Sequence, residues 1–105
     1  MIKVIIKESD SINNIEISGH SGYKEIGSDI VCASVSSICI TTVNGILNID
    51  DKAIKYKEDE GYLFIEIVKH GDTIDKLIYN LIDLLEELKK QYKKHIEIRR
   101  CHKWD

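Results

Sequence analysis

The chain contains no proline, only six glycines among its 105 residues, and no stretch rich in glycine and serine. Linkers between domains draw on these residue types, so the composition marks no boundary inside the chain. A length of 105 residues is also close to the common size of one domain. We therefore expect residues 1–105 to form a single domain.

Long hydrophobic runs and an excess of one charge are also missing. The uninterrupted apolar runs are much shorter than the roughly 20 residues that cross a bilayer. The start of the chain, Met1 to Lys7, alternates like a strand and does not resemble a signal peptide. Basic residues number 15 and acidic residues 18, giving a net charge of −3 with both signs interspersed. We therefore expect neither a membrane nor a direct nucleic-acid partner.

The three cysteines form no disulfide framework, because their number is odd and their spacing matches no such scaffold. Reduced thiols are typical of a cytoplasmic protein, which is the location we expect. The cysteines and the four histidines contain no C-x-x-C or H-x-x-x-H pair. We therefore predict no metal site and no other cofactor.

The hydrophobic period changes repeatedly along the chain and predicts an α+β fold. Alternating residues indicate strands over 2–7, 12–18, 53–57, 62–69 and 96–100. Apolar residues spaced by three and four predict helices over about 29–48 and from 71 to 92. The resulting order is ββαββαβ, for which a mostly antiparallel sheet packed against two helices is the economical arrangement.

Two local patterns carry the candidate chemistry. His20 lies between glycines where the second strand ends, and Cys32 lies near the start of the first helix. If Ser28 or Asp29 caps that helix, Cys32 is its third or fourth residue, where the helix macrodipole favours a thiolate. A nearby histidine would supply a general base. The structural alternative is that Cys32 is a small buried hydrophobe and His20 an ordinary polar residue.

Other residues near this pair also allow two interpretations. Ser36 lies four residues after Cys32 and so shares its helix face, where it could bind substrate, orient His20 or simply pack. Asp29 could orient His20 as a third catalytic member, or cap the helix. Cys39, two turns beyond Cys32 on the apolar stripe, is predicted to lie in the core.

Taken together, the two patterns resemble a known family. The segment Gly19-His20-Ser21, followed by Asp29-Ile30-Val31-Cys32-Ala33-Ser34-Val35-Ser36, is similar to the ribosomal-processing cysteine protease family called Prp. That family has a Gly-His-Ala segment and an Asp-x-Val-Cys-Ala-Ala-x-Ser segment about a dozen residues apart. Ser21 and Ser34 stand where the family usually has alanine, and both are changes between small residues.

The resemblance implies a function and a set of site residues. Members of the family remove the N-terminal extension of ribosomal large-subunit protein twenty-seven and form homodimers. By position, the nucleophile corresponds to Cys32 and its base to His20. Asp29, Ser36, Gly19 and Ser21 correspond to motif positions that would assist catalysis or bind substrate.

We expect this reaction to use an oxyanion site and a mobile cover. Backbone N–H groups in the first helical turn, near Cys32, are the candidate oxyanion donors. The loop over residues 21–28 is the candidate lid. One alternative is a non-catalytic ribosome- or protein-binding module with a structural Cys32. Another is a hydrolase or thiol-transfer enzyme that acts on small molecules.

Overall fold

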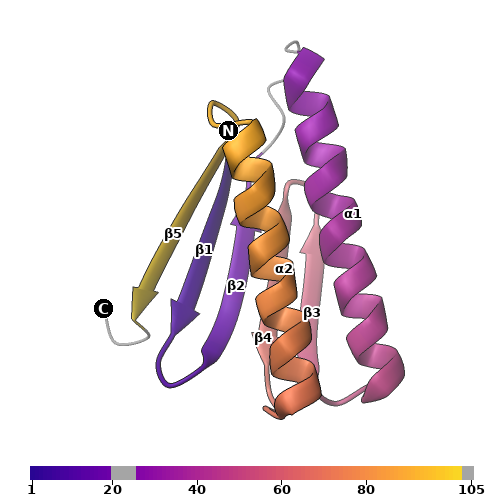
Figure 1. Cartoon of the computed structure of the whole chain (residues 1–105). Coiled ribbons are helices and arrows are strands. Elements are labelled where there is room, and N and C mark those ends of the chain that lie inside the picture. Colours follow the sequence, from indigo (N-terminus) through magenta and orange to yellow (C-terminus); the bar gives the residue numbers. More distant parts are fainter. Residues whose placement is uncertain (20–25, 103–105) are drawn as a thin grey trace.

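The computed structural model describes residues 1–19 and 26–102, and the side chains of 1–19 and 30–102. The elements follow one another in the predicted ββαββαβ order (Figure 1). They are β1 (Ile2–Glu8), β2 (Ile12–Ser18), α1 (Ile26–Ile49), β3 (Ile54–Asp59), β4 (Tyr62–Ile67), α2 (Asp72–Gln91) and β5 (Ile96–His102). Most boundaries lie within two residues of those predicted from the hydrophobic pattern.

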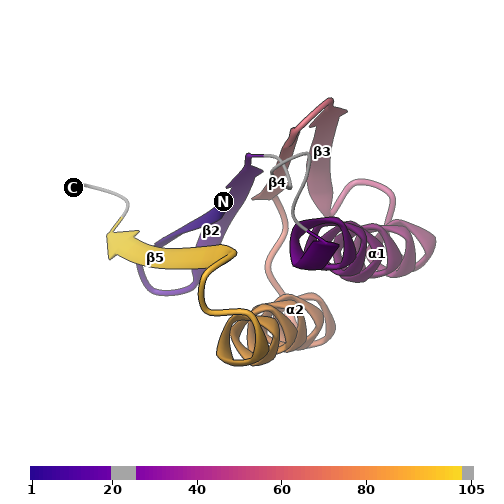
Figure 2. The ribbon, with the colours of Figure 1, turned by 90° about the horizontal axis from the view of Figure 1, so that it is seen from above.

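The five strands form one sheet in the order β3-β4-β2-β1-β5. The β1–β2, β2–β4 and β3–β4 pairs are antiparallel, whereas β1 and β5 run parallel. Both helices cover the same face of this sheet, with α1 near the β3–β4 side and α2 near the β1–β5 side (Figure 2). The prediction of a mostly antiparallel sheet packed against two helices is confirmed, and the parallel pair joins the first and last strands.

The core lies between the sheet and the helices, where alternate residues of the strands meet one stripe of each helix. Val4, Ile15 and Ile65 are completely buried on neighbouring strands. The buried stripe of α1 comprises Val31, Val35, Cys39, Val43 and Ile46. That of α2 comprises Ile74, Ile78, Leu81, Ile82 and Leu85. These residues belong to the predicted stripes, so the core positions of both helices, Cys39 included, are confirmed.

The start of α1 differs from the prediction. The helix begins at Ile26, three residues before Asp29, so Cys32 is its seventh residue and lies beyond the first turn. Because adding a residue to an existing helix forms one hydrogen bond for each residue fixed, Gly27 and Ser28 are incorporated although they resemble a loop in sequence. Neither Ser28 nor Asp29 is therefore the residue that caps the helix.

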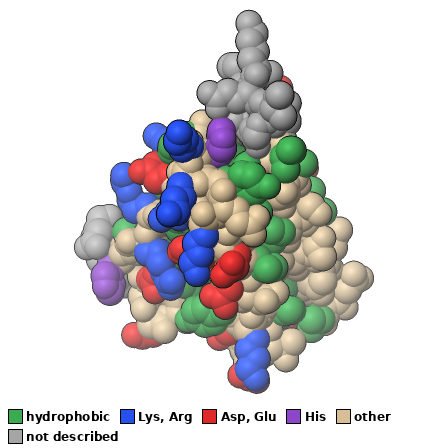
Figure 3. Space-filling view, turned by 45° about the horizontal axis from the view of Figure 1, so that its top comes forward, with side chains coloured by type: hydrophobic (Ala, Val, Ile, Leu, Met, Phe, Trp, Pro, Cys, Tyr) green, Lys and Arg blue, Asp and Glu red, His purple; other side chains and the backbone are tan. Residues whose placement is uncertain are grey.

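The exposed surfaces of the two helices have opposite character. Residues 30–49 of α1 include no charged side chain and are long and apolar enough, by length and composition, to cross a membrane. The helix meets this criterion by its mean hydropathy, since serine, threonine and asparagine interrupt its apolar runs, and the core helix of a globular protein meets the same criterion. In the folded structure its buried stripe packs on the sheet. In contrast, α2 has acidic residues in its first turn and basic residues in its last. Figure 3 shows the charged side chains gathered away from the uncharged α1 side.

Candidate active site

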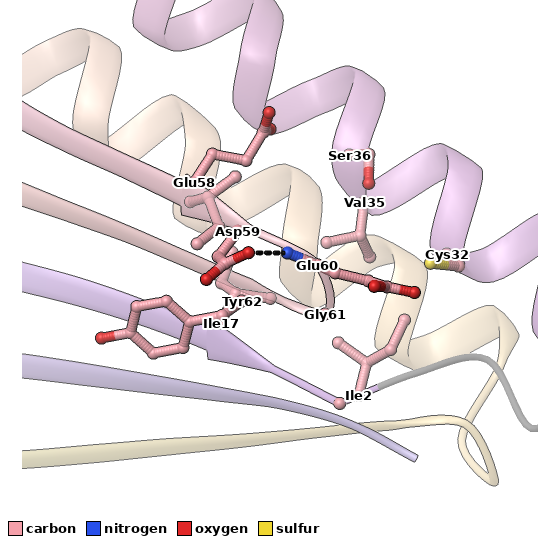
Figure 4. Close-up of a pocket in the computed structure, with 12 residues that line it drawn as sticks. Ile2, Ile17, Cys32, Val35, Ser36, Glu58, Asp59, Glu60, Gly61 and Tyr62 are labelled. Atoms are coloured by element: carbon pink, nitrogen blue, oxygen red, sulfur yellow. Dashed lines mark hydrogen bonds between the residues drawn. The ribbon is translucent and has the colours of Figure 1, made fainter.

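A cavity of about 570 Å³ opens between α1 and the β3–β4 hairpin. Its volume lies within the roughly 300–1,000 Å³ typical of ligand pockets. Figure 4 shows residues of α1 on one wall and the hairpin turn on the other. The lining residues are Ile2, Ile17, Gly19, Cys32, Val35, Ser36, Glu58, Asp59, Glu60, Gly61, Tyr62 and Leu63.

Cys32 is the cysteine that reaches this cavity. Its side chain is half-buried, and all three cysteines are free thiols. Cys39, two turns further along the same helix, is completely buried, and this burial raises the pKa of its thiol to about 12. Cys101 lies on β5, where its Sγ contacts the carbonyl oxygen of Ile6 at 3.8 Å. Of the three thiols, only that of Cys32 is placed to meet a ligand in the cavity.

Ser36 brings a hydroxyl group to the same wall, one helical turn after Cys32. Elsewhere on α1, the hydroxyls of Ser34 and Thr42 donate hydrogen bonds back to the carbonyl oxygens four residues earlier, at 2.8 and 2.9 Å. Ser36 is exposed and makes no such bond within the described part of the chain. Its hydroxyl is therefore available to a bound molecule.

Gly19 lines the rim of the cavity, where the end of β2 meets the hairpin turn. Its N–H donates a hydrogen bond to the carbonyl oxygen of Gly61 at 3.1 Å. Its φ of 105° lies in a region that glycine adopts readily and other residues avoid. A Cβ at this position would also collide with the backbone carbonyl oxygen of Met1. Glycine is therefore required here both by backbone conformation and by the close approach of another strand.

Three predicted site residues cannot be placed in this geometry. His20 and Ser21 lie outside the described residues, and so does most of the loop predicted as a lid. Asp29 belongs to the backbone of α1, but its side chain is outside the described part. The structure thus brings together Cys32, Ser36 and Gly19 from the predicted set.

The early start of α1 changes the expected electrostatics around Cys32. The four N–H groups without a helical partner belong to residues 26–29, because α1 begins at Ile26. The N–H of Cys32 lies in the helix interior, where an N–H bonds the carbonyl four residues earlier. The first-turn N–H groups therefore lie before Cys32 in the helix rather than beside it, and their role as oxyanion donors stays a prediction.

The acidic side of the cavity was not predicted, because Glu58, Asp59 and Glu60 lie between the strands expected over 53–57 and 62–69. The hydroxyl of Tyr56 donates a 2.7 Å hydrogen bond to Oε2 of Glu58. Burial, reinforced by this bond, raises the pKa of Tyr56 to about 12. The Asp59 carboxylate accepts the backbone N–H of Glu60 at 2.8 Å. The strand alternation that points Ile54 and Tyr56 inward would also have directed Glu58 toward α1.

A metal centre finds no support in the described residues. Within ranges 1–19 and 26–102, no group of three or more His, Cys, Asp or Glu side chains is arranged to hold an ion. The described lining of the cavity offers a thiol, a hydroxyl and carboxylates. An accessible thiol in a pocket between a helix and a sheet is typical of an enzyme that uses a cysteine nucleophile.

Known proteins of one family resemble this chain over most of its length. The family model described as cysteine protease Prp matches residues 1–97. The chain belongs to this family, and it is a cysteine protease.

Two curated relatives extend over nearly the whole chain. The ribosomal processing cysteine protease Prp of Bacillus subtilis (strain 168) is 28% identical, covering 93% of this chain and 96% of the relative. The protein of that name from Staphylococcus aureus (strain NCTC 8325 / PS 47) is 22% identical, covering 92% of this chain and 94% of the relative.

Solved structures show the same fold. The essential ribosomal processing protease Prp from S. aureus, solved with a substrate peptide, superposes with a TM-score of 0.88 at 24% identity. That match covers 96% of this chain and all of the other. The same S. aureus protein has also been solved with a covalently linked product peptide, with a TM-score of 0.86 at 24% identity, 96% coverage of this chain and 100% of the other.

Proposed function

We propose that this protease removes the N-terminal extension of ribosomal large-subunit protein twenty-seven, with Cys32 as nucleophile and His20 as base. Membership of the Prp family and the names of its curated relatives support a substrate from the ribosome. The S. aureus relative with a covalently linked product peptide supports a step in which the enzyme is bonded to part of its substrate.

The observation that carries this proposal is the position of Cys32. It is the only one of the three cysteines that lines the cavity, and Ser36 shares its helix face. The other half-buried thiol, that of Cys101, lies on β5 and takes no part in the cavity. A peptide in the cavity would thus meet a single candidate sulfur nucleophile.

The reaction follows from the two proposed groups. His20 takes the proton from Sγ of Cys32, and the sulfur attacks the scissile carbonyl carbon to form a tetrahedral intermediate. The C–N bond breaks as His20 returns that proton to the leaving amine, leaving a thioester on Cys32. Water then attacks the thioester with His20 as base, and the products are a carboxylate and the restored thiol.

Ser36 has a specific place in this proposal. Its unpaired hydroxyl lies one turn from the nucleophile, on the wall that a bound peptide would contact. A hydroxyl there can donate a hydrogen bond to a substrate carbonyl oxygen, a role that the interior N–H of Cys32 does not fill in this conformation. Ser36 therefore acts in substrate positioning or in stabilising the oxyanion.

We also propose a cytoplasmic homodimer. The exposed side of α1 carries large apolar residues without neighbouring charges, including Ile30, Ile40 and Ile49, which are 52%, 38% and 56% exposed. An uncharged face can meet a copy of itself without like-charge repulsion, which suits a two-fold interface. Free thiols suit a reducing compartment.

The direct test is to incubate the N-terminally extended ribosomal protein with the wild type, with Cys32→Ala and with Cys101→Ala, and to follow the products by mass spectrometry. We expect one cut that removes the extension with the wild type and Cys101→Ala, and none with Cys32→Ala. Cleavage by Cys32→Ala would contradict the assigned nucleophile.

Thiol reactivity separates this proposal from a non-catalytic binding module. Iodoacetamide should label Cys32 in the native protein, whereas Cys39, with a pKa of about 12, should be labelled only after unfolding. An inert Cys32 together with an intact ribosomal substrate would favour the binding module. Rapid labelling without cleavage would favour an enzyme that acts on another substrate.

A further inference from the structure

The hairpin wall of the cavity carries negative charge that no described residue neutralises through an ion pair. Glu58 and Glu60 are both exposed and both line the cavity. Neither forms an ion pair within the part of the chain that the structure describes. No lysine or arginine is among the described residues that line the cavity. A molecule bound beside Cys32 would therefore meet carboxylates that are not paired with a lysine or arginine of the described residues.

The three carboxylates of the hairpin are engaged to different extents: Glu58 and Asp59 each accept one hydrogen bond through one oxygen, whereas Glu60 accepts none within the described part of the chain. The Asp59 carboxylate accepts the N–H of Glu60 and so helps to fix the hairpin turn. Glu58 is held through Oε2 by the Tyr56 hydroxyl, which leaves its other oxygen available. In Figure 4, the Glu58 side chain rises on the Ser36 side and that of Glu60 points from the turn toward Cys32. The available carboxylates thus lie across the cavity from the nucleophile and hydroxyl of α1.

We propose that Glu58 and Glu60 select substrates that carry a lysine or arginine side chain close to the scissile bond. This inference depends on the proposed function, in which a peptide occupies the cavity and is cut by Cys32. An ammonium or guanidinium group donates charge-assisted hydrogen bonds to carboxylates, whereas an acidic side chain at the same place would be repelled. The two glutamates are specificity determinants that act on binding and orientation.

The glutamates of the hairpin turn also have an ordinary structural explanation, since acidic side chains often keep an exposed turn solvated. The two explanations differ in one respect that can be measured. If the glutamates only solvate the turn, the cleavage rate should not depend on the charge of the peptide. A specificity site makes the effect of each glutamate depend on the residue carried by the substrate.

The experiment uses synthetic peptides that span the ribosomal extension and its cleavage site. At each position flanking the scissile bond in turn, the series carries lysine, glutamine or glutamate. The ratio kcat/KM is measured for the wild type, Glu58→Gln, Glu60→Gln and the double variant. Glu66→Gln is the matched control, because Glu66 lies on β4 but does not line the cavity.

We expect the wild type to prefer lysine over glutamine about tenfold at one or two positions. Each single variant should lower that preference about threefold, and the double variant should abolish it. Glu66→Gln should keep the wild-type preference. Glu60→Lys should reverse the selectivity and favour the peptide with glutamate, a gain that loss of folding cannot produce.

The outcomes separate this inference from the proposed function. Equal cleavage of the lysine, glutamine and glutamate peptides would overturn the inference while leaving the protease activity established. Loss of rate by Glu58→Gln and Glu60→Gln that is equal on all peptides would also overturn it. Failure of the wild type to cut any peptide would overturn the proposed function, and the inference with it.

Discussion

The molecule divides into two halves that use similar elements for different purposes. One half, the α1 half, combines α1 with the β3–β4 hairpin, and the other, the α2 half, combines α2 with β1 and β5. In the α2 half, charge is arranged in pairs: Lys76 contacts Asp72 at 3.1 Å, Lys90 contacts Glu87 at 3.4 Å, and Arg100 contacts Glu8 at 2.7 Å. In the α1 half, the helix has no charge from 30 to 49. Glu58 and Glu60 face a cavity whose described lining includes no lysine or arginine.

This difference shows which half of the molecule is arranged for more than folding stability. A helix with an apolar stripe and a charged opposite face, like α2, has what it needs to bury one side and keep the other in water. The α1 half instead brings a thiol, a hydroxyl and two carboxylates to a cavity, and within the described residues neither carboxylate forms an ion pair. Groups left without internal partners are the ones that a substrate can engage.

Removing the thiol from the α1 half should have the largest effect. We expect Cys32→Ala to lower kcat/KM on the extension peptide by a thousandfold or more, on the order reported for removal of a catalytic nucleophile. The free energy of unfolding should change little, because the side chain is half-buried at the cavity. Peptide cleavage assays and urea unfolding measure the two effects. Full activity in Cys32→Ala would show that the α1 half does not supply the nucleophile.

A core substitution in the α2 half should give the opposite result. Leu81 is completely buried, so Leu81→Ala should lower the free energy of unfolding by about 2–5 kcal/mol. The kcat/KM per folded molecule should stay near the wild-type value, because Leu81 does not line the cavity. Unfolding in urea, combined with active-site titration by alkylation, distinguishes lost folding from lost chemistry.

The glycine at the rim offers a matched pair of tests. Gly19→Ala should lower the free energy of unfolding by about 1–3 kcal/mol and reduce cleavage, because the residue has a positive φ and its Cβ would meet the Met1 carbonyl. Gly45→Ala, inside α1, meets nothing within 4 Å and should raise stability by about 0.5–1 kcal/mol. Thermal unfolding measures the stability of both variants. The same change in stability for Gly19→Ala and Gly45→Ala would show that the rim imposes no constraint.

The smallest effect should come from the surface ion pair of the α2 half. The hydrogen bond from Arg100 lowers the pKa of Glu8 below its usual 4.5. A lowered carboxylate pKa stabilises the fold above the unfolded value, and this contribution is lost as pH falls through the folded value. Because both side chains are partly exposed, Arg100→Gln should cost only about 0.5 kcal/mol at neutral pH. In urea unfolding curves the difference should shrink as pH falls below the unfolded value of about 4.5.

The elements of the fold could be predicted from sequence because each has a clear local period. The buried stripe of α2 repeats over about three turns, and the alternation in β1 identifies the buried Ile2, Val4 and Ile6. The pairing of β1 with β5 could not be predicted, since it joins strands about 90 residues apart and no local pattern records a partner. The start of α1 was missed because Gly27 and Ser28 are poor helix formers that the backbone nevertheless includes.

The site was predictable to a smaller extent. The helical spacing of Cys32 and Ser36 put both on one face, as the cavity shows. Glu58 and Glu60 come from a hairpin almost thirty residues further along, and their approach to α1 depends on how the sheet and helix pack. A charged turn in the sequence does not by itself indicate that its side chains will lie close to a helix. The strand alternation through Tyr56 was the available clue.

The parallel pairing of β1 and β5 has a practical consequence for handling the protein. Ile2 lines the cavity, and the carbonyl oxygen of Met1 lies against Gly19 at its rim. A polypeptide joined before Met1 would therefore emerge at the mouth of the cavity. Since β5 runs in the same direction as β1, its last residue, His102, lies at the opposite end of the sheet (Figure 1). Affinity tags, fluorescent fusions and surface immobilisation should therefore be attached through the carboxyl-terminal side, which keeps the entrance open to substrate.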